Sequence, residues 1–124
     1  MRLRAPGFTL IELLVVMAII ATLLTIVAPR YFASVDRAKE TVLKQNLSIM
    51  RDAIDKYYAD TGNYPDDLHQ LVEERYIRAI PVDPITDQAV WVEIPPPDDE
   101  MDGVYDVRTI SDRQALDGTF YESW

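Results

Sequence analysis

Carboxylates are the side chains of this sequence most able to do chemistry, and they gather in its last third. An acidic run at 98–102 is followed by Asp106, Asp112 and Asp117. A hard cation such as Ca²⁺ requires several converging oxygen ligands, so one hypothesis is a calcium site that includes Asp112 and Asp117. The alternative is a solvated acidic surface, because the spacing matches no EF-hand loop and Arg113 adds a positive charge.

Catalytic groups are sparse. His69 is the only histidine, and the chain has no cysteine. We expect His69 on the outside of a short helix, where a surface side chain is a simpler interpretation than a general base. The serines lie in no nucleophile elbow, and the four glycines form no phosphate-binding loop. We therefore expect a protein that is not an enzyme.

Glu12 is the single ionisable side chain between residues 8 and 28. A carboxylate within an apolar membrane segment costs up to a few kcal/mol and usually marks a function or a partner. In a helix Glu12 would lie only ~6 Å along the axis from Phe8, near the interface, where that cost is smaller. One interpretation is a carboxylate that reaches water, and the other is one that meets a positively charged partner.

The apolar run around Glu12 has the length of a membrane anchor. As a helix, 8–28 would extend ~32 Å, close to the ~30 Å hydrocarbon core of a bilayer. Arg2 and Arg4 in the preceding segment 1–7 favour a cytoplasmic N-terminus. An ordinary signal peptide has a shorter apolar core of ~7–15 residues, whereas an uncleaved signal anchor fits the hydropathy alone. Pro29, which follows the run, either bends the helix or marks the membrane exit.

Residues 29–60 are predicted to continue as an amphipathic helix. One apolar face recurs at spacings of three and four, and four further positions widen it: Leu43, Leu47, Met50, Ile54, Tyr57, then Val42, Ile49, Ala53 and Tyr58. Gly62 is suited to a left-handed C-cap, and Pro65 prevents the helix from resuming. Asp66 is then expected to cap a short helix that buries Leu68, Leu71 and Val72 and ends near Arg75.

The remaining sequence predicts a small antiparallel sheet. Residues 89–94 alternate as a strand does, 104–110 form a second strand, and Phe120 and Tyr121 belong to a third. The proline-rich and acidic segment 95–103 reads as an exposed loop. The fold class is therefore α+β, with a long N-terminal helix packed on a small antiparallel sheet and residues 61–124 as its globular region.

Length and charge limit the function. A chain of 124 residues forms one small domain, and its net charge is −9. Loss of residues 1–7 would leave 10 basic against 21 acidic residues, a net charge of −11. Such a surface repels phosphate, so no nucleic-acid partner is expected. Without disulfides, so small a domain gains stability from its anchor, a bound ion or its neighbours.

Residues 7–16 resemble the class III signal of type IV prepilins and pseudopilins. They read Gly7-Phe8-Thr9-Leu10-Ile11-Glu12, followed by Leu13-Leu14-Val15-Val16. The resemblance implies that prepilin peptidase removes 1–7 by cutting between Gly7 and Phe8, and that Phe8 is then N-methylated. It also implies that Glu12 meets the terminal amine of an adjacent subunit's Phe8 and sets the axial register. Pro29 matches a proline that many family members carry.

The middle of the chain is similar to the major, G-type pseudopilin of type II secretion systems. The similarity lies in the order of these residues: Tyr57, Gly62, Tyr64-Pro65, Leu68, Leu71-Val72, Tyr76-Ile77 and Ile80-Pro81-Val82-Asp83-Pro84. This resemblance implies a pilin-like fold, a single-pass inner-membrane anchor and a periplasmic domain. It further implies a filament of identical subunits that drives protein export, with minor pseudopilins and the inner-membrane secretion platform as partners. Such pseudopilins bind calcium in a C-terminal loop, from whose longer glycine- and aspartate-rich form 111–119 departs.

Two other functions remain open. A type IV pilin would serve adhesion, twitching motility or DNA uptake, but the missing cysteine pair and the short outer region argue against it. A monomeric membrane-anchored binding module or enzyme could carry the same signal. A deletion strain separates the three through secreted hydrolases, surface fibres or neither.

Overall fold

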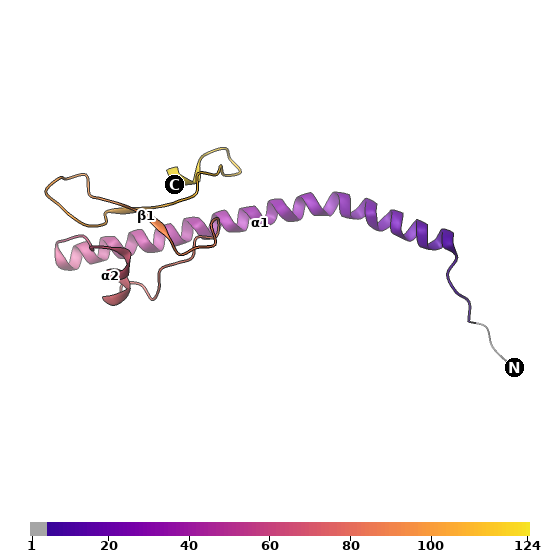
Figure 1. The fold of residues 1–124 in the computed structure, drawn as a ribbon, viewed down its shortest axis with the longest axis horizontal. Helices are drawn as coiled ribbons and strands as arrows, with labels where there is room; N and C mark the ends of the chain where they lie inside the picture. Colours follow the sequence, from indigo (N-terminus) through magenta and orange to yellow (C-terminus); the bar gives the residue numbers. More distant parts are fainter. Residues whose placement is uncertain (1–4) are drawn as a thin grey trace. The chain divides into compact units, whose positions relative to one another are not determined.

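The computed structural model describes residues 5–124 and divides the chain into two compact units, Met1–Val35 and Asp36–Trp124. The first four residues of the predicted leader 1–7, with Arg2 and Arg4, lie outside the described residues. One helix, α1 (Leu10–Thr61), contributes to both units (Figure 1).

The first unit contains the apolar part of α1. An 18-residue window of this helix has a mean hydropathy of 2.8 and no buried residue, so it is long and apolar enough to cross a membrane. Its two threonine hydroxyls bond within the helix, from Thr22 Oγ1 to the Ala18 carbonyl and from Thr25 Oγ1 to the Ala21 carbonyl, both at 2.8 Å. Such internal bonding suits a lipid environment, where no water satisfies a hydroxyl.

The second half of α1 supplies the core of the second unit. The five residues of the predicted apolar face are buried, as is Ala53. The wider stripe is wrong at Val42, Ile49 and Tyr58, which stay 37–43% exposed. Val42 and Ile49 lie on the flanks of the helix, and Tyr58 remains partly exposed although its ring stacks on Tyr64. Gly62 ends the helix as predicted, with φ +76° and its N–H donating to the Tyr58 carbonyl at 2.8 Å.

The short helix α2 (Leu68–Glu73) lies beside the C-terminal part of α1 (Figure 1). Leu68 and Leu71 are buried as predicted. The predicted cap is wrong by one residue: Asp67, not Asp66, accepts the Gln70 N–H at 2.8 Å, because the helix begins at Leu68. The helix also ends before Arg75, which takes a φ of +64°.

The sheet has two antiparallel strands, β1 (Trp91–Ile94) and β2 (Asp106–Thr109), with Trp91 opposite Thr109. Both are shorter than predicted. Trp91, Val107 and Thr109 are buried. The third strand is wrong: Phe120 makes only an isolated bridge to Gln114, and Tyr121–Ser123 form the 3₁₀ helix η1. The amides of Ser123 and Trp124 bond back to the carbonyls of Phe120 and Tyr121, which turns the chain out of an extended course.

The architecture is the predicted α+β arrangement of one long helix and a small antiparallel sheet. The loop 95–103 is largely exposed as expected, except that Pro96 is buried and Met101 and Gly103 are partly buried.

Candidate functional site

The N-terminus of α1 is closed by a reciprocal pair of hydrogen bonds between Thr9 and Glu12. The Thr9 N–H donates to Glu12 Oε2 at 2.9 Å, and the Glu12 N–H donates to Thr9 Oγ1 at 3.3 Å. This capping box satisfies two of the amides that a helix leaves unpaired at its start. We expected a role for Glu12 between subunits and overlooked Thr9, although the spacing Thr-x-x-Glu before an apolar run is a capping-box signature.

One oxygen of Glu12 remains available. Within residues 5–124, Oε1 accepts no hydrogen bond. The carboxylate shares a shallow depression of about 350 Å³ with four apolar side chains: Phe8, Ile11, Val15 and Val16. Phe8 is 91% exposed. The first turn of α1 therefore combines an accessible carboxylate oxygen with an exposed apolar surface, and such an oxygen can accept a charge-assisted hydrogen bond from a cationic group.

Pro29 lies inside α1, which continues without a break on both sides of it. Because proline has no N–H, the Thr25 carbonyl loses its usual helical donor at this position. The helix is thus weakened by one hydrogen bond but not ended.

The predicted calcium ligands find no support in the arrangement of the acidic side chains. Within residues 5–124, no group of three or more His, Asp or Glu side chains lies close enough to hold a metal ion. Asp117 Oδ1 already accepts the N–H of Thr119 at 2.9 Å and its hydroxyl at 2.6 Å. These bonds lower the pKa of the Asp117 carboxyl. Asp112 is exposed, and calcium binding stays a prediction.

Two side chains of α1, Glu40 and Arg51, form hydrogen bonds to the segment 111–124, and the sequence analysis singled out neither. Glu40 Oε1 accepts both the Leu116 N–H and the Tyr121 hydroxyl at 2.8 Å. Burial and this bond raise the pKa of Tyr121 to about 12. Arg51 donates from Nε to Asp106 at 2.7 Å and from Nη2 to the main-chain oxygen of Trp124 at 2.6 Å. No sequence signal marks these pairs, because their partners are 55–81 residues away.

A buried carboxylate organises the segment before β1. Asp83 is fully buried, and its two oxygens accept the Ile85 N–H at 2.8 Å and the Thr109 hydroxyl. Nearby, the indole of Trp91 donates to the Pro81 carbonyl at 2.8 Å. The Ile80–Pro84 motif thus serves to attach this segment to the sheet. His69 is exposed on α2.

The N-terminal segment defines the class of protein. Residues 2–28 match the prokaryotic N-terminal methylation motif. A long apolar helix opened by this motif, followed by a small α+β unit, is a pilin-like arrangement.

Relatives specify the family further. The type II secretion system core protein G of Pseudomonas aeruginosa is 33% identical over 99 residues, which cover 67% of this chain and 70% of that protein. Its namesake in Escherichia coli is 31% identical over 94 residues, covering 63% and 65%. The type IV wide pilus major component PilA4 of Thermus thermophilus is 38% identical over 68 residues, covering 55% and 52%. No solved structure matches the chain.

The chain belongs to the family of the type II secretion system core protein G, the G-type pseudopilins. It spans 52–70% of the length of the three relatives described above. The matched segment 2–28 includes the capped first turn of α1, with Gly7 and Phe8 directly before Thr9.

Proposed function

We propose that this chain is the repeating subunit of a type II secretion pseudopilus, a helical filament whose growth drives protein export across the outer membrane. Prepilin peptidase cuts between Gly7 and Phe8, and Phe8 becomes N-methylated. The apolar part of α1 then anchors the subunit in the bacterial inner membrane with the second unit in the periplasm. Minor pseudopilins and the inner-membrane secretion platform are its further partners.

The single observation that carries the proposal is the first turn of α1. Glu12 keeps Oε1 available beside an exposed apolar surface, while Oε2 holds the Thr9 amide at 2.9 Å. A neighbour's methylated amine at Phe8 is a cation that this oxygen can accept, and a charge-assisted hydrogen bond is among the stronger polar contacts. Identical subunits joined in this head-to-tail way continue into an open helical array.

Replacing Glu12 by Gln tests the pairing without disturbing the helix start. Glutamine serves in a capping box as glutamate does, so Glu12→Gln keeps the bond to Thr9 but removes the negative charge. We expect this variant to be cleaved and inserted as the parent chain is, but to yield few filaments. Thr9→Ala is the matched control, because it disturbs the cap and keeps the charge, and it should assemble. Normal filaments from Glu12→Gln would refute the pairing.

Processing is tested separately on the mature subunit. Mass spectrometry of the chain recovered from membranes should find an N-terminus at Phe8 with the mass of one added methyl group. A mature chain that retains residues 1–7, or begins elsewhere, would contradict the assigned cleavage site.

A type IV pilus is the second candidate, favoured by the 38% identity to a Thermus thermophilus protein named as a pilus component. A deletion strain distinguishes the two. Loss of exported proteins with surface fibres intact supports the pseudopilus, whereas loss of fibres or twitching with export intact supports the pilus.

A further inference from the structure

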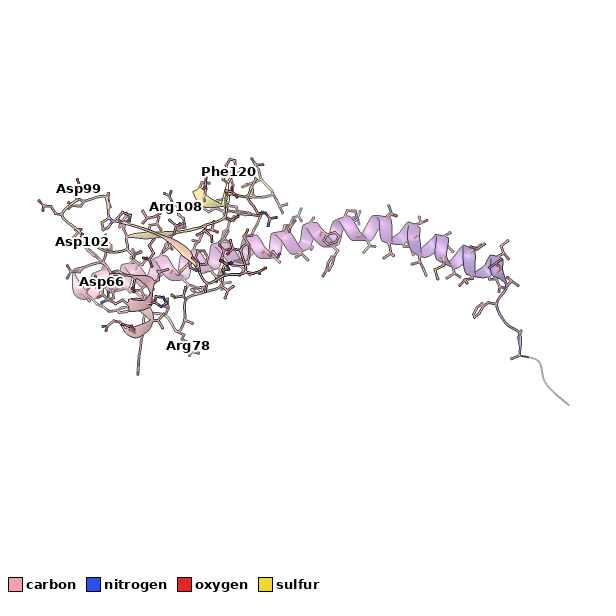
Figure 2. All side chains as sticks on the ribbon, viewed as in Figure 1. Asp66, Arg78, Asp99, Asp102, Arg108 and Phe120 are labelled. Atoms are coloured by element: carbon pink, nitrogen blue, oxygen red, sulfur yellow. The ribbon has the colours of Figure 1, made fainter. Side chains whose placement is uncertain are left out.

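The end of the chain, residues 111–124, lies beside the second half of α1, and we name it the C-terminal strap. It is drawn in the yellow shades of Figure 1, and Figure 2 labels Phe120 within it. Its regular structure is the three-residue helix η1, and its buried residues are Ser111, Ala115 and Tyr121. Because so few buried side chains supply little burial free energy, polar bonds must hold the strap in place.

Glu40 of α1 is the centre of these bonds. Its Oε1 accepts the Leu116 N–H and the Tyr121 hydroxyl, each at 2.8 Å. The two donors lie on either side of a tight turn at Gly118, whose φ is +87°. A single carboxylate oxygen of α1 therefore binds both arms of the strap, and bonds to an ionised acceptor are stronger than those between neutral groups.

Two cations of α1 continue the same line of contacts. Lys44 places its Nζ 4.5 Å from the centre of the Trp124 ring. Arg51 donates from Nη2 to the main-chain oxygen of Trp124 at 2.6 Å. Residues four or seven positions apart lie on the same side of a helix. Glu40, Lys44 and Arg51 thus form a charged row on α1 that contacts the strap.

The turn of the strap is also closed on itself. Asp117 Oδ1 accepts the Thr119 N–H at 2.9 Å and the Thr119 hydroxyl at 2.6 Å. That hydroxyl in turn accepts the indole N–H of Trp124 at 2.8 Å. The Thr119 carbonyl accepts the Ala115 N–H at 2.7 Å. The oxygen atoms of the turn are therefore already acceptors for donors of the strap itself.

These oxygen atoms do not fit the calcium ion that the family resemblance implies for residues 111–119. Calcium requires ~6–8 oxygen ligands that converge on one point. Within residues 5–124, no three His, Asp or Glu side chains lie close enough together to hold a metal ion. Arg113, exposed in the same segment, adds a positive charge that opposes a cation. The strap is thus built to be fastened by protein groups.

We infer that Glu40 fastens the C-terminal strap to α1 in place of a bound ion, so that the order of the strap does not depend on calcium. One oxygen that accepts a donor from each arm joins the two arms and α1 at a single point, as a shared ion would. Glu40 is in this sense a positioning residue for the whole strap. The inference concerns the folding of the second unit and does not depend on the proposed filament.

Amide hydrogen exchange of the full-length chain in detergent measures how often the strap opens. The informative amides are those of Ala115 and Tyr121, because they bond within the strap and not to Glu40. Glu40→Ala should speed their exchange at least about tenfold, since it removes two bonds to a charged acceptor. Amides of β1 and β2 should change less than about threefold, which verifies that the rest of the unit is folded.

Asp36→Ala is the matched control. It removes the same charge from an exposed position four residues before Glu40 on α1, and the strap amides should exchange as in the parent chain. Glu40→Gln retains a carbonyl oxygen that can accept both bonds, so it should restore most of the protection. Equal exchange in Glu40→Ala and Asp36→Ala would show that Glu40 does not hold the strap.

The independence from calcium is tested on the parent chain. A chelator, or calcium added in its place, should change the exchange of the strap amides less than about twofold. Faster exchange with chelator that calcium reverses would overturn the inference. Tyr121→Phe keeps the ring but removes one of the two bonds to Glu40, and it should speed exchange by about three- to tenfold. No change in this variant would also overturn the inference, even if Glu40→Ala fails to fold.

Discussion

Replacing Gly103 by alanine tests the contact that holds the loop 95–103 against the turn after α1. Gly103 has a φ of +109°, and an added Cβ would lie 2.7 Å from the Pro65 carbonyl and 3.0 Å from the Tyr64 Cβ. Both obstacles are backbone or backbone-proximal atoms, so a side-chain rotation cannot relieve them. The substitution therefore imposes a strained backbone and a steric clash together.

The two costs are separable in size. A left-handed backbone costs an L residue ~1–2 kcal/mol, and forced overpacking adds ~1–3 kcal/mol. Gly103→Ala should thus destabilise the second unit by ~2–5 kcal/mol. Gly62→Ala is the matched control, because Gly62 also has a positive φ, +76°, but nothing within 4 Å of an added Cβ. Its cost should be the backbone part alone, ~1–2 kcal/mol.

Urea unfolding of the detergent-solubilised chain, followed by tryptophan fluorescence, measures the difference. Trp91 is buried in the second unit and Trp124 packs edge-on against Tyr121 at 5.0 Å, so both report on its folding. A gap of ~2 kcal/mol between the two variants corresponds to ~8–16 °C in melting temperature for a unit of this size. If Gly103→Ala and Gly62→Ala differ by less than ~0.5 kcal/mol, which is the usual scatter of surface substitutions, the close approach at Gly103 is not present.

Three further predictions concern the second unit. Burial and the bond to Glu40 raise the pKa of Tyr121 to about 12. The stabilisation that Tyr121 contributes is therefore fully present below the unfolded tyrosine pKa of ~10, and it is lost as the pH rises from there through 12. Urea titrations at several pH values should find this loss smaller in Tyr121→Phe. Asp83→Ala leaves the Thr109 hydroxyl and the Ile85 amide unpaired and should lower the free energy of unfolding by ~2–4 kcal/mol. The control Asp87→Ala, at an exposed position with a φ of +57°, should lower it by ~1–2 kcal/mol. Equal unfolding midpoints would contradict the role of Asp83. Chelation of calcium should leave the melting temperature of the second unit unchanged, because Asp117 is already occupied by Thr119, and a fall on chelation, reversed by added Ca²⁺, would establish a calcium site there.

The parts of the fold that follow a regular period were predictable from the sequence. The apolar positions from Leu43 to Tyr57 recur every three or four residues, and all five predicted positions are buried. Gly62 was equally predictable, since its left-handed φ follows from its place after an apolar helix and before Pro65. The apolar period also placed Val42 and Ile49 on this face, yet both are exposed. A period indicates which face of a helix is apolar but not how far the packed elements extend around it.

The contacts that close the second unit were not predictable. The bonds from Leu116 and Tyr121 to Glu40 join residues 76 and 81 positions apart, and neither residue type nor spacing marks them. The supposed strand at Phe120 has strand-forming residues, but the bond of the Tyr121 hydroxyl to Glu40 on α1 holds this segment in a 3₁₀ turn instead. Tertiary context, not local propensity, decides such short segments.

The first turn of α1 contains Glu12, whose role between subunits stays a prediction, and Thr9, which the sequence reasoning missed. A negative charge at a helix N-terminus is stabilised by the helix dipole and by the amides it caps. Glu12 receives both contributions from its own chain, because its Oε2 binds the Thr9 amide. The carboxylate is therefore oriented within its own chain, and in the proposed pairing only its Oε1 exchanges water for a neighbour's amine. The helix cap and the proposed contact between subunits thus use different oxygens of one side chain, so we expect glutamine at this position to preserve the cap and prevent filament formation.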